Sequence, residues 1–220
     1  MPPPVPEPAG LRPGWPARLG PLRVAGLEVR LRPVRLRDGS DWARIRRRDE
    51  TYLRPWEPTT HGGWARRNSS AEWPGRWWLL RSSARRGQSL PFVITVDGAF
   101  GGHVMIGNVV REPLLSAYVG YWVDSGLAGR GVTTAAVALV LDHCFGPVRL
   151  HRVEATVRPE NAASVAVLGK LGFRREGLLR RYLDVDGAWR DHYSFAVTAE
   201  EVPPGGFAAR LIRDGRASRT

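Results

Sequence analysis

One short segment of the sequence has the residue types and the spacing that bind phosphate groups. It reads DSGLAGRGVTT, covers residues 124–134, and lies between an expected strand and an expected helix. The first turn of a helix leaves backbone N–H groups unpaired and carries a partial positive charge. Glycines let a ligand approach the backbone closely. The segment therefore predicts a phosphate or diphosphate site, formed by Gly129, Arg130, Gly131, Val132 and Thr133.

The glycine spacing excludes two common nucleotide-binding loops. The chain contains no G-x-x-x-x-G-K-[ST], which is the pattern of a Walker-type loop. It also lacks a G-x-G-x-x-G that follows an early strand and has an acidic residue about 20 positions later, the pattern of a dinucleotide fold. A Gly-Arg-Gly turn can also be purely structural, so the prediction depends on its place between a strand and a helix.

A second segment places two polar side chains on an otherwise apolar helix. Asn161 and Ser164 are three residues apart, and the residues around them are alanine, valine, leucine and glycine. Side chains at this spacing share one face of a helix. Asn161 is also a good N-cap, and Ser164 could bond back to a carbonyl one turn earlier. A structural and a chemical role therefore both stay open for these two residues.

Hydrophobic periodicity predicts the elements that position these residues. Expected strands are residues 27–32, 92–96, 103–110, 117–124, 151–157, 178–185 and 188–197, and expected helices are residues 38–48, 72–86, 132–144 and 161–171. Asp97-Gly98 and Asp186-Gly187 mark hairpin turns, and Gly172 is a typical end of a helix. This order predicts the α/β class, with a mixed, mostly antiparallel twisted sheet flanked by helices.

The length of 220 residues suits one domain with two loose ends. Residues 1–21 are rich in proline and predict a disordered leader. Residues 22–202 form the predicted domain, and residues 203–220 predict a flexible basic tail. No apolar run is long enough for a membrane helix and no secretory signal begins the chain, which predicts a cytoplasmic protein without a membrane partner.

The composition narrows the chemistry further. The formal net charge is +12, and Lys170 is the only lysine among 33 basic residues. This arginine usage fits a GC-rich genome as well as a functional field for phosphates or a ribosomal partner. Cys144 is the only cysteine, so no internal disulfide can form, and we expect it to be buried and inert. His143 and His151 are expected to be buried, and no cluster has metal-ligand spacing, so no metal is expected.

With these motifs the chain resembles the GNAT superfamily of N-acetyltransferases. The diphosphate motif of that family is Q/R-x-x-G-x-G/A. Gly129 and Gly131 match its glycines, and Gly126 stands at its first position. The stretch HRVEATVRPENAASVAVLGKLGFRREGLLRRYLDVDGAWRDHY, residues 151–193, is similar to the RimJ/RimL branch, the ribosomal-protein alanine and serine N-acetyltransferases. The earlier LRPWEP and GYWVD fit the same branch, and the similarity covers residues 27–200.

The resemblance implies that acetyl-CoA is the co-substrate and suggests which residues hold it. The predicted binding residues beyond the glycine loop are Tyr121, Trp122, Val123, Asn161 and Ser164. The strand residues are expected to pair with the pantetheine arm, and an N–H near Val123 to stabilise the oxyanion. Many relatives carry a tyrosine where Leu168 stands, so the hydroxyl of Ser164 is the predicted proton donor to the thiolate.

The resemblance does not identify the base. Thr156 and Leu183 stand where relatives carry a glutamate. Glu154 and Asp191 are therefore the predicted acidic catalytic residues, with His192 beside Asp191 as a further candidate, each acting through a water. An α-amino group has a pKa near 7.7–8.0, so catalysis without a dedicated base also stays open.

The leading hypothesis for function is acetylation of the N-terminal α-amino group of a ribosomal or other protein. One alternative is an acetyltransferase of a small amine or a lysine side chain, because a fold does not determine its acceptor. Others are a basic RNA-binding module and an acyl-CoA-binding module without turnover. Association with the ribosome and formation of a homodimer are left open. Trp56, in the LRPWEP segment, is left open between core packing and the site.

Overall fold

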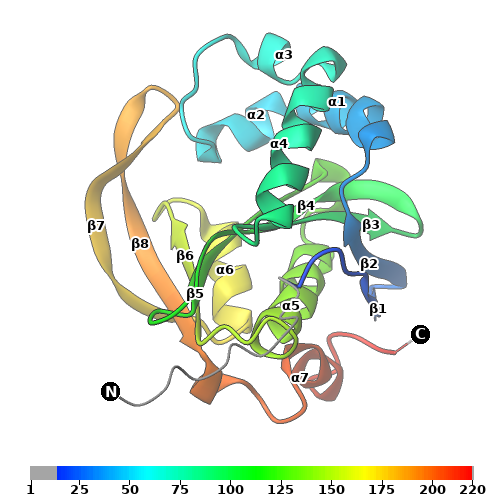
Figure 1. The fold of residues 1–220 in the computed structure, drawn as a ribbon, viewed down its shortest axis with the longest axis vertical. Helices are drawn as coiled ribbons and strands as arrows, with labels where there is room; N and C mark the ends of the chain where they lie inside the picture. Colours follow the sequence, from blue (N-terminus) through cyan, green and yellow to red (C-terminus); the bar gives the residue numbers. More distant parts are fainter. Residues whose placement is uncertain (1–13, 220) are drawn as a thin grey trace, which may run out of the picture.

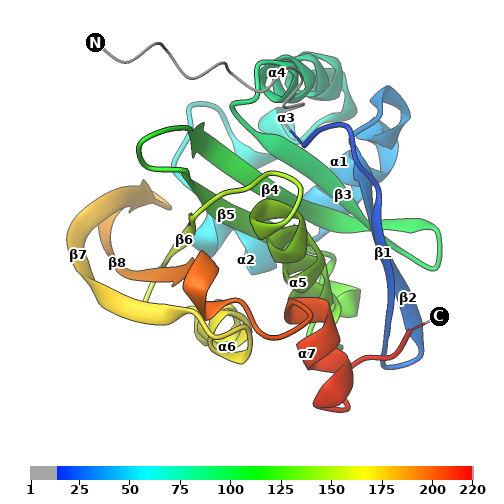
Figure 2. The same ribbon diagram turned by 60° about the horizontal axis from the view of Figure 1, so that its bottom comes forward.

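The computed structural model describes residues 14–219 as one sheet with helices on both faces (Figures 1 and 2). The strands are β1 Leu19–Val24, β2 Leu27–Pro33, β3 Leu90–Val96, β4 Ala99–Val110, β5 Ser116–Val123, β6 Arg152–Val157, β7 Arg174–Val185 and β8 Ala188–Thr198. They lie in the order β1-β2-β3-β4-β5-β6-β8-β7. All neighbours are antiparallel except β5 and β6, which are parallel. The predicted fold class is confirmed.

The helices cover the two faces of the sheet unequally. They are α1 Gly39–Arg48, α2 Glu50–Leu53, α3 Trp64–Arg67, α4 Trp73–Arg85, α5 Val132–Phe145, α6 Ala162–Lys170 and α7 Phe207–Arg213. Helices α5, α6 and α7 lie on one face, and α1 and α4 lie on the other (Figure 2). Strand β3 is apolar on both sides because each side is covered: Phe92 and Ile94 pack in the core with α5, and Val93 packs with Trp42 and Trp73 in a second, smaller core.

Helix α5 is buried on nearly all sides, although its apolar spacing predicts one apolar face. The reason is α7, which covers the side of α5 that faces away from the sheet (Figure 2). Phe207 of α7 stacks on Phe145 with ring centroids 6.0 Å apart. Asp142 of α5 accepts hydrogen bonds from the first amides of α7, Phe207 (2.6 Å) and Ala208 (3.0 Å). Cys144 is buried in this core, as expected.

The expected loose ends differ from the structure. Within the predicted tail, 203–220, α7 buries Phe207 and Leu211 almost completely, and Ser218 forms a bridge to Arg23 of β1. The burial of these aromatic and aliphatic side chains offsets the conformational entropy that the segment loses when it becomes ordered. The predicted leader falls partly on residues 1–13, which lie outside the described residues. Its last part is ordered, since Trp15 is buried and β1 already begins at Leu19.

One irregularity of the sheet positions the site. Strands β5 and β6 pair only through residues 116–118 and 152–154. Beyond Tyr118 the two strands separate, while β5 stays paired with β4 as far as Val123. Among residues 14–219, the separation leaves one edge of β5 without a strand partner in the middle of the sheet.

Candidate active site

A cavity of about 160 Å³ lies where β5 and β6 separate. Its lining residues are Trp56, Val119, Gly120, Tyr121, Ala155, Thr156, Val157, Arg158, Asn161, Ser164 and His192. They come from β5, β6, the start of α6, strand β8 and the 3-10 turn Arg54–Trp56. The cavity thus brings together the predicted residues Tyr121, Asn161 and Ser164 with His192, which the sequence had named as a further candidate for the base.

The start of α6 holds Ser164 by its backbone and leaves its hydroxyl available. Asn161 is the N-cap of α6, and its side-chain oxygen accepts the N–H of Ser164 at 3.0 Å. The carbonyl of Ser164 accepts the hydroxyl of Tyr121 at 3.4 Å. Among residues 14–219 the side chain of Ser164 has the neighbouring Tyr121 hydroxyl as its hydrogen-bond partner, and it does not bond back to the preceding turn. Burial raises the pKa of Tyr121 to about 12, which keeps its hydroxyl protonated at neutral pH.

Strand β5 presents main-chain groups to the same space. The amide of Asp124 donates to Gly101 of β4 at 2.8 Å. Hydrogen-bonding groups alternate in direction along a strand, so the N–H groups of Tyr121 and Val123 point away from β4, toward the gap beside β6. In the described part of the chain no strand pairs with them there. This geometry suits the predicted pairing of Tyr121 and Val123 with an extended ligand.

Trp122 faces the other side of the sheet. Its ring lies 5.5 Å from that of His103 and 6.0 Å from that of Phe100, and the guanidinium of Arg46 lies 5.2 Å from it. These residues belong to the second core. Burial and three neighbouring arginines lower the pKa of His103 to about 3, so this histidine is neutral. Trp122 was predicted with the binding residues, but the structure gives its side chain a packing role.

The predicted phosphate loop lies at the far end of β5, at the N-terminus of α5. Gly129 and Gly131 have φ angles of 73° and 81°, which glycine adopts without strain. Gly131 is the N-cap of α5, and no side chain caps this helix end. A Cβ at Gly129 would meet nothing within 4 Å, and one at Gly131 would lie 3.8 Å from Val24. Packing therefore does not require these glycines; their left-handed backbone does, and the amides of the first turn that follow suit an anion.

The two predicted acidic residues lie outside the cavity lining. Glu154 pairs with Arg152 at 2.7 Å, at the level where β5 and β6 are still joined. The carboxylate of Asp191 accepts the backbone N–H of Arg181 at 2.8 Å. Arg181 has a φ of 47° and belongs to a bulge in β7, where the register with β8 shifts between Leu179 and Leu183. Both carboxylates have structural partners, which argues against either of them as the base.

Sequence reasoning missed Arg158 and left Trp56 undecided, although both line the cavity. Trp56 is 37% exposed, so it is not a core residue. The guanidinium of Arg158 lies 5.4 Å from the ring of Trp56 and donates to the carbonyl of Pro55 at 2.7 Å. The signal was present in the sequence, because Arg158 begins the R-x-E-N-x-x-S stretch and Trp56 belongs to LRPWEP. Their contact joins two motifs about 100 residues apart.

The segment 54–59 is also bonded to the tip of the β7–β8 hairpin, residues 184–187, and we call these two segments the clasp (Figure 1). The bonds run from the Thr59 hydroxyl to Asp184 (2.6 Å), from the Thr59 amide to the Asp184 carbonyl (2.8 Å), from the Gly187 amide to the Thr59 hydroxyl (2.8 Å) and between Arg54 and Asp186 (2.9 Å). The clasp borders the cavity on the side of Trp56.

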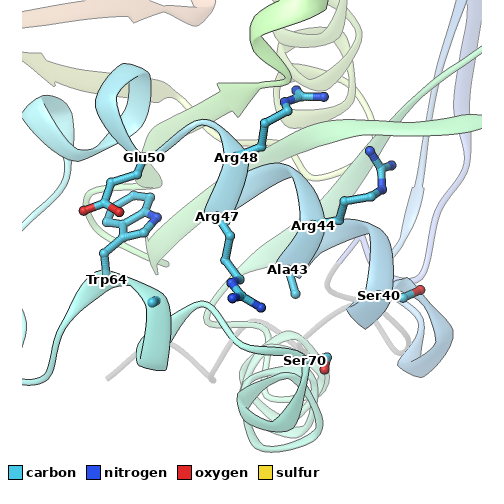
Figure 3. A pocket seen from close by; sticks show the side chains of 9 residues that line it. Ser40, Ala43, Arg44, Arg47, Arg48, Glu50, Trp64 and Ser70 are labelled. Carbon is cyan, nitrogen blue, oxygen red and sulfur yellow. The ribbon is translucent and has the colours of Figure 1, made fainter.

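A wider surface hollow of about 690 Å³ lies between α1 and α3 (Figure 3). Arg47 extends into it toward Ser70, and Glu50 lies beside Trp64 at one end (Figure 3). Arg48, at its rim, is held by Asp49 at 2.8 Å and Asp124 at 2.5 Å. The hollow shares no residue with the cavity at the strand separation. We place the candidate active site at the smaller cavity, because it contains the predicted residues Tyr121, Asn161 and Ser164 and borders the main-chain amides of β5 that face away from β4.

The two histidines that were expected to be buried, His143 and His151, lie in different surroundings. His143 is buried, and its Nε2 lies 2.6 Å from the carbonyl of Gly14. His151 was expected to be buried as well, but it is exposed and pairs with Glu200 at 3.0 Å.

Among residues 14–219, no three His, Cys, Asp or Glu side chains gather closely enough to hold a metal ion. None of the described helices combines the length and the apolar character needed to span a bilayer.

Comparison with known proteins gives consistent results. The model of the acetyltransferase (GNAT) domain family matches residues 28–174. The structure of Mycobacterium smegmatis RimJ in complex with CoA-disulfide superposes with a TM-score of 0.92 at 55% identity, covering 94% of this chain and 99% of that one. The [ribosomal protein uS5]-alanine N-acetyltransferase of Escherichia coli is 27% identical over 198 residues, 87% of this chain and 98% of that protein. The Bacillus subtilis N-acetyltransferase YjcK is 41% identical over 101 residues, and the chain spans only 56% of its length. These findings confirm the resemblance seen in the sequence.

Proposed function

Because this chain belongs to the GNAT acetyltransferase domain family, we propose that it transfers the acetyl group of acetyl-CoA to the N-terminal α-amino group of a ribosomal or other protein. The observation that carries the proposal is the course of β5. One end of this strand leads to the uncapped N-terminus of α5, and its unpaired edge passes the cavity that contains Ser164. A long ligand with a phosphate group at one end and a reactive group at the other fits this arrangement.

The residues divide the binding of acetyl-CoA between them. The amides of residues 129–133 would hold the diphosphate, and Arg130 would add charge. The main chain of Tyr121 and Val123 would orient the pantetheine arm. Acetyl-CoA itself supplies an acetyl group activated as a thioester. The amide of Val123 is the proposed donor to the developing oxyanion.

Ser164 is the proposed donor of a proton to the leaving sulfur. Ser164 lines the cavity, and among residues 14–219 its side chain is hydrogen-bonded only to the neighbouring Tyr121. Tyr121 stands next to it and keeps its proton at neutral pH, as its raised pKa requires. Leu168, at the position where many relatives carry a tyrosine, is fully buried and supplies no such group.

The proposed acceptor follows from the relatives. The Escherichia coli relative is named for an alanine of ribosomal protein uS5 and is matched along almost its full length. We infer a protein N-terminus that begins with a small residue as the acceptor class here. Ribosome association, a homodimer and a cytoplasmic location stay predictions.

The test combines an assay with a comparison of cells. Purified protein is incubated with acetyl-CoA and peptides that begin with alanine or serine, and with the same peptides blocked at the N-terminus but carrying an internal lysine. Polyamines and aminoglycosides serve as small amines. We expect acetylation of the free N-termini only, and loss of one acetyl group from one ribosomal protein in cells that lack this chain. Preferential acetylation of lysine or small amines would support the alternative acceptor class. RNA binding without affinity for acetyl-CoA would refute the proposal that the protein is an acetyltransferase.

A further inference from the structure

We propose that His192 is the general base that takes the proton from the acceptor amine, an assignment that rests on the proposed acetyl transfer. His192 lies on β8 and lines the same cavity as Ser164 and Tyr121, which come from α6 and β5. Its side chain is 4% exposed. The imidazole therefore lies in the cavity together with the group proposed to protonate the sulfur.

The composition of the cavity lining favours this assignment. Among its lining residues there is no carboxylate, lysine or cysteine. The hydroxyl groups of Thr156, Ser164 and Tyr121 are too weakly basic to accept a proton at neutral pH, and the guanidinium of Arg158 has no acceptor atom. Glu154 and Asp191 are held by Arg152 and by the amide of Arg181. The imidazole is thus the lining group that can accept a proton in the physiological range.

A backbone contact sets the tautomer of His192. Its Nδ1 lies 3.1 Å from the carbonyl oxygen of Arg190. A carbonyl oxygen only accepts hydrogen bonds, so Nδ1 carries the hydrogen and donates it. In the neutral ring the lone pair is then on Nε2, which has no hydrogen-bond partner within residues 14–219. Nε2 is therefore the atom that can receive a proton from a ligand in the cavity.

The bulge in β7 fixes the orientation of the ring. The bulge begins after Leu179, which pairs with His192 across the hairpin, and Asp191 holds it by accepting the amide of Arg181. Its extra residues turn Tyr182 toward the imidazole, where the two rings meet edge to face with centroids 5.5 Å apart. Asp191 is accordingly a positioning residue for the base.

The charges around His192 keep it neutral. Burial lowers its pKa, and the positive charge of Arg158, which directly follows β6, acts in the same direction. The carbonyl of Arg190, Glu160 before α6 and Asp191 on β8 act in the opposite direction without reversing the shift. Tyr182 of β7 adds an uncharged ring. At pH 7 the imidazole is thus unprotonated, as a base must be.

The step balances with the groups present. As the acceptor nitrogen forms its bond to the thioester carbon, a proton passes from that nitrogen to Nε2 of His192. The C–S bond then breaks, its electron pair leaves on sulfur, and the sulfur takes a proton from Ser164. The imidazolium returns its proton to the serine oxygen, directly or through a water in the cavity, which restores both groups. No oxidant or reductant is required.

The test measures kcat as a function of pH for the wild type, His192→Gln and His192→Ala, using whichever amine the wild type acetylates fastest. General-base catalysis contributes about 100- to 10,000-fold, so we expect kcat of His192→Gln to fall at least about 100-fold at pH 7. The acid limb of the profile should be lost, the Kd for acetyl-CoA should change less than about twofold, and added imidazole should partly restore His192→Ala. The matched control is His151→Gln, which alters an exposed histidine away from the cavity.

The possible outcomes separate the two proposals. If His192→Gln keeps its kcat and its acid limb, the base assignment is wrong while acetyl transfer stands. If activity falls together with acetyl-CoA affinity, or imidazole does not restore His192→Ala, the side chain has a structural role and the assignment is also wrong. A wild-type protein that acetylates no amine overturns both proposals.

Discussion

The carboxylate of Asp49 accepts two hydrogen bonds from Ser125, one from the backbone N–H at 2.9 Å and one from the hydroxyl at 2.8 Å. Asp49 directly follows α1, and Ser125 opens the turn that leads from β5 to the glycine loop. Arg48 joins Asp49 to Asp124 by ion pairs of 2.8 and 2.5 Å. Helix α1 therefore holds the start of the glycine loop, although α1 and α5 cover opposite faces of the sheet.

The first prediction concerns this contact and the affinity for acetyl-CoA. Asp49→Ala removes the acceptor of both Ser125 bonds, so the loop loses its fixed starting point. We expect the Kd for acetyl-CoA to rise about tenfold and the free energy of unfolding to fall by about 1–3 kcal/mol. Calorimetric titration and urea unfolding measure the two effects. Asp41→Ala, which removes an exposed pair with Arg44 on the same helix, should change neither quantity. An unchanged Kd in Asp49→Ala would contradict the role of this contact.

The same carboxylate predicts how stability depends on pH. Burial acts to raise the pKa of Asp49, but the hydrogen bonds from Arg48 and Ser125 outweigh it and hold the pKa below its ordinary value of 3.8. A lowered folded-state pKa means that the contribution is complete above the ordinary pKa and is lost as the pH falls through the folded one. We expect Asp49→Asn to lose less stability than the wild type between about pH 5 and pH 3 in urea unfolding. Equal losses in the two proteins would show that this carboxylate does not contribute.

Gly131 provides a direct test of the phosphate loop. Gly131→Asp places a carboxylate and a side chain at the uncapped end of α5, where the diphosphate is proposed to bind. We expect the Kd for acetyl-CoA to rise at least about 100-fold, because a like charge and a steric block act together. Gly98→Asp is the matched control, since Gly98 has a similar φ of 83° and open space in the β3–β4 turn. Normal acetyl-CoA binding by Gly131→Asp would refute the site.

Ser164 should affect turnover and leave binding unchanged. Within the described chain its side chain is bonded only to the Tyr121 hydroxyl, so Ser164→Ala should lower the free energy of unfolding by no more than about 1 kcal/mol. We expect kcat to fall about 10- to 100-fold while the Kd for acetyl-CoA stays nearly constant. Steady-state kinetics with an alanine peptide measure kcat. A normal kcat would show that Ser164 is not the proton donor to the sulfur. The neighbouring Tyr121 would then be the candidate donor, and Tyr121→Phe is the variant that tests it.

Asp191 distinguishes a positioning role from proton transfer. Asp191→Ala frees the amide of Arg181 and loosens the bulge that holds Tyr182 against His192. We expect kcat/KM to fall about tenfold while the acid limb of the pH profile stays in place. Loss of the acid limb itself would instead make Asp191 the base.

The sequence predicts those parts of the molecule that depend on local pattern. These parts depend on residues that are close together in the sequence. They are the helix after Gly131, the turns at Asp97-Gly98 and Asp186-Gly187, and the cap at Asn161. Helix α7 has only seven residues, and its stability comes from Phe145, which is 62 residues away, so its own sequence gives little signal. The same reason explains why a basic tail was expected there.

The site depends on geometry that no single segment encodes. Strands β5 and β6 separate after three residue pairs, and the periodicity of either strand does not show where pairing stops. His192 reaches the cavity through the register of β8 with β6 and the bulge opposite it, and a bulge at Arg181 has no glycine to mark it. The motifs therefore identify which residues matter, and the tertiary structure decides which of them share a cavity.

The clasp gives the cavity a border without a free end. From β6 the border runs through Arg158 to segment 54–59, crosses to the hairpin tip, and returns along β8, which pairs with β6. Neither Asp184 nor Gly187 of the hairpin tip lines the cavity, but their bonds to Thr59 connect the tip to the wall that holds Trp56 and Arg158. We therefore expect a substitution at the tip to change the shape of the cavity without touching any group inside it.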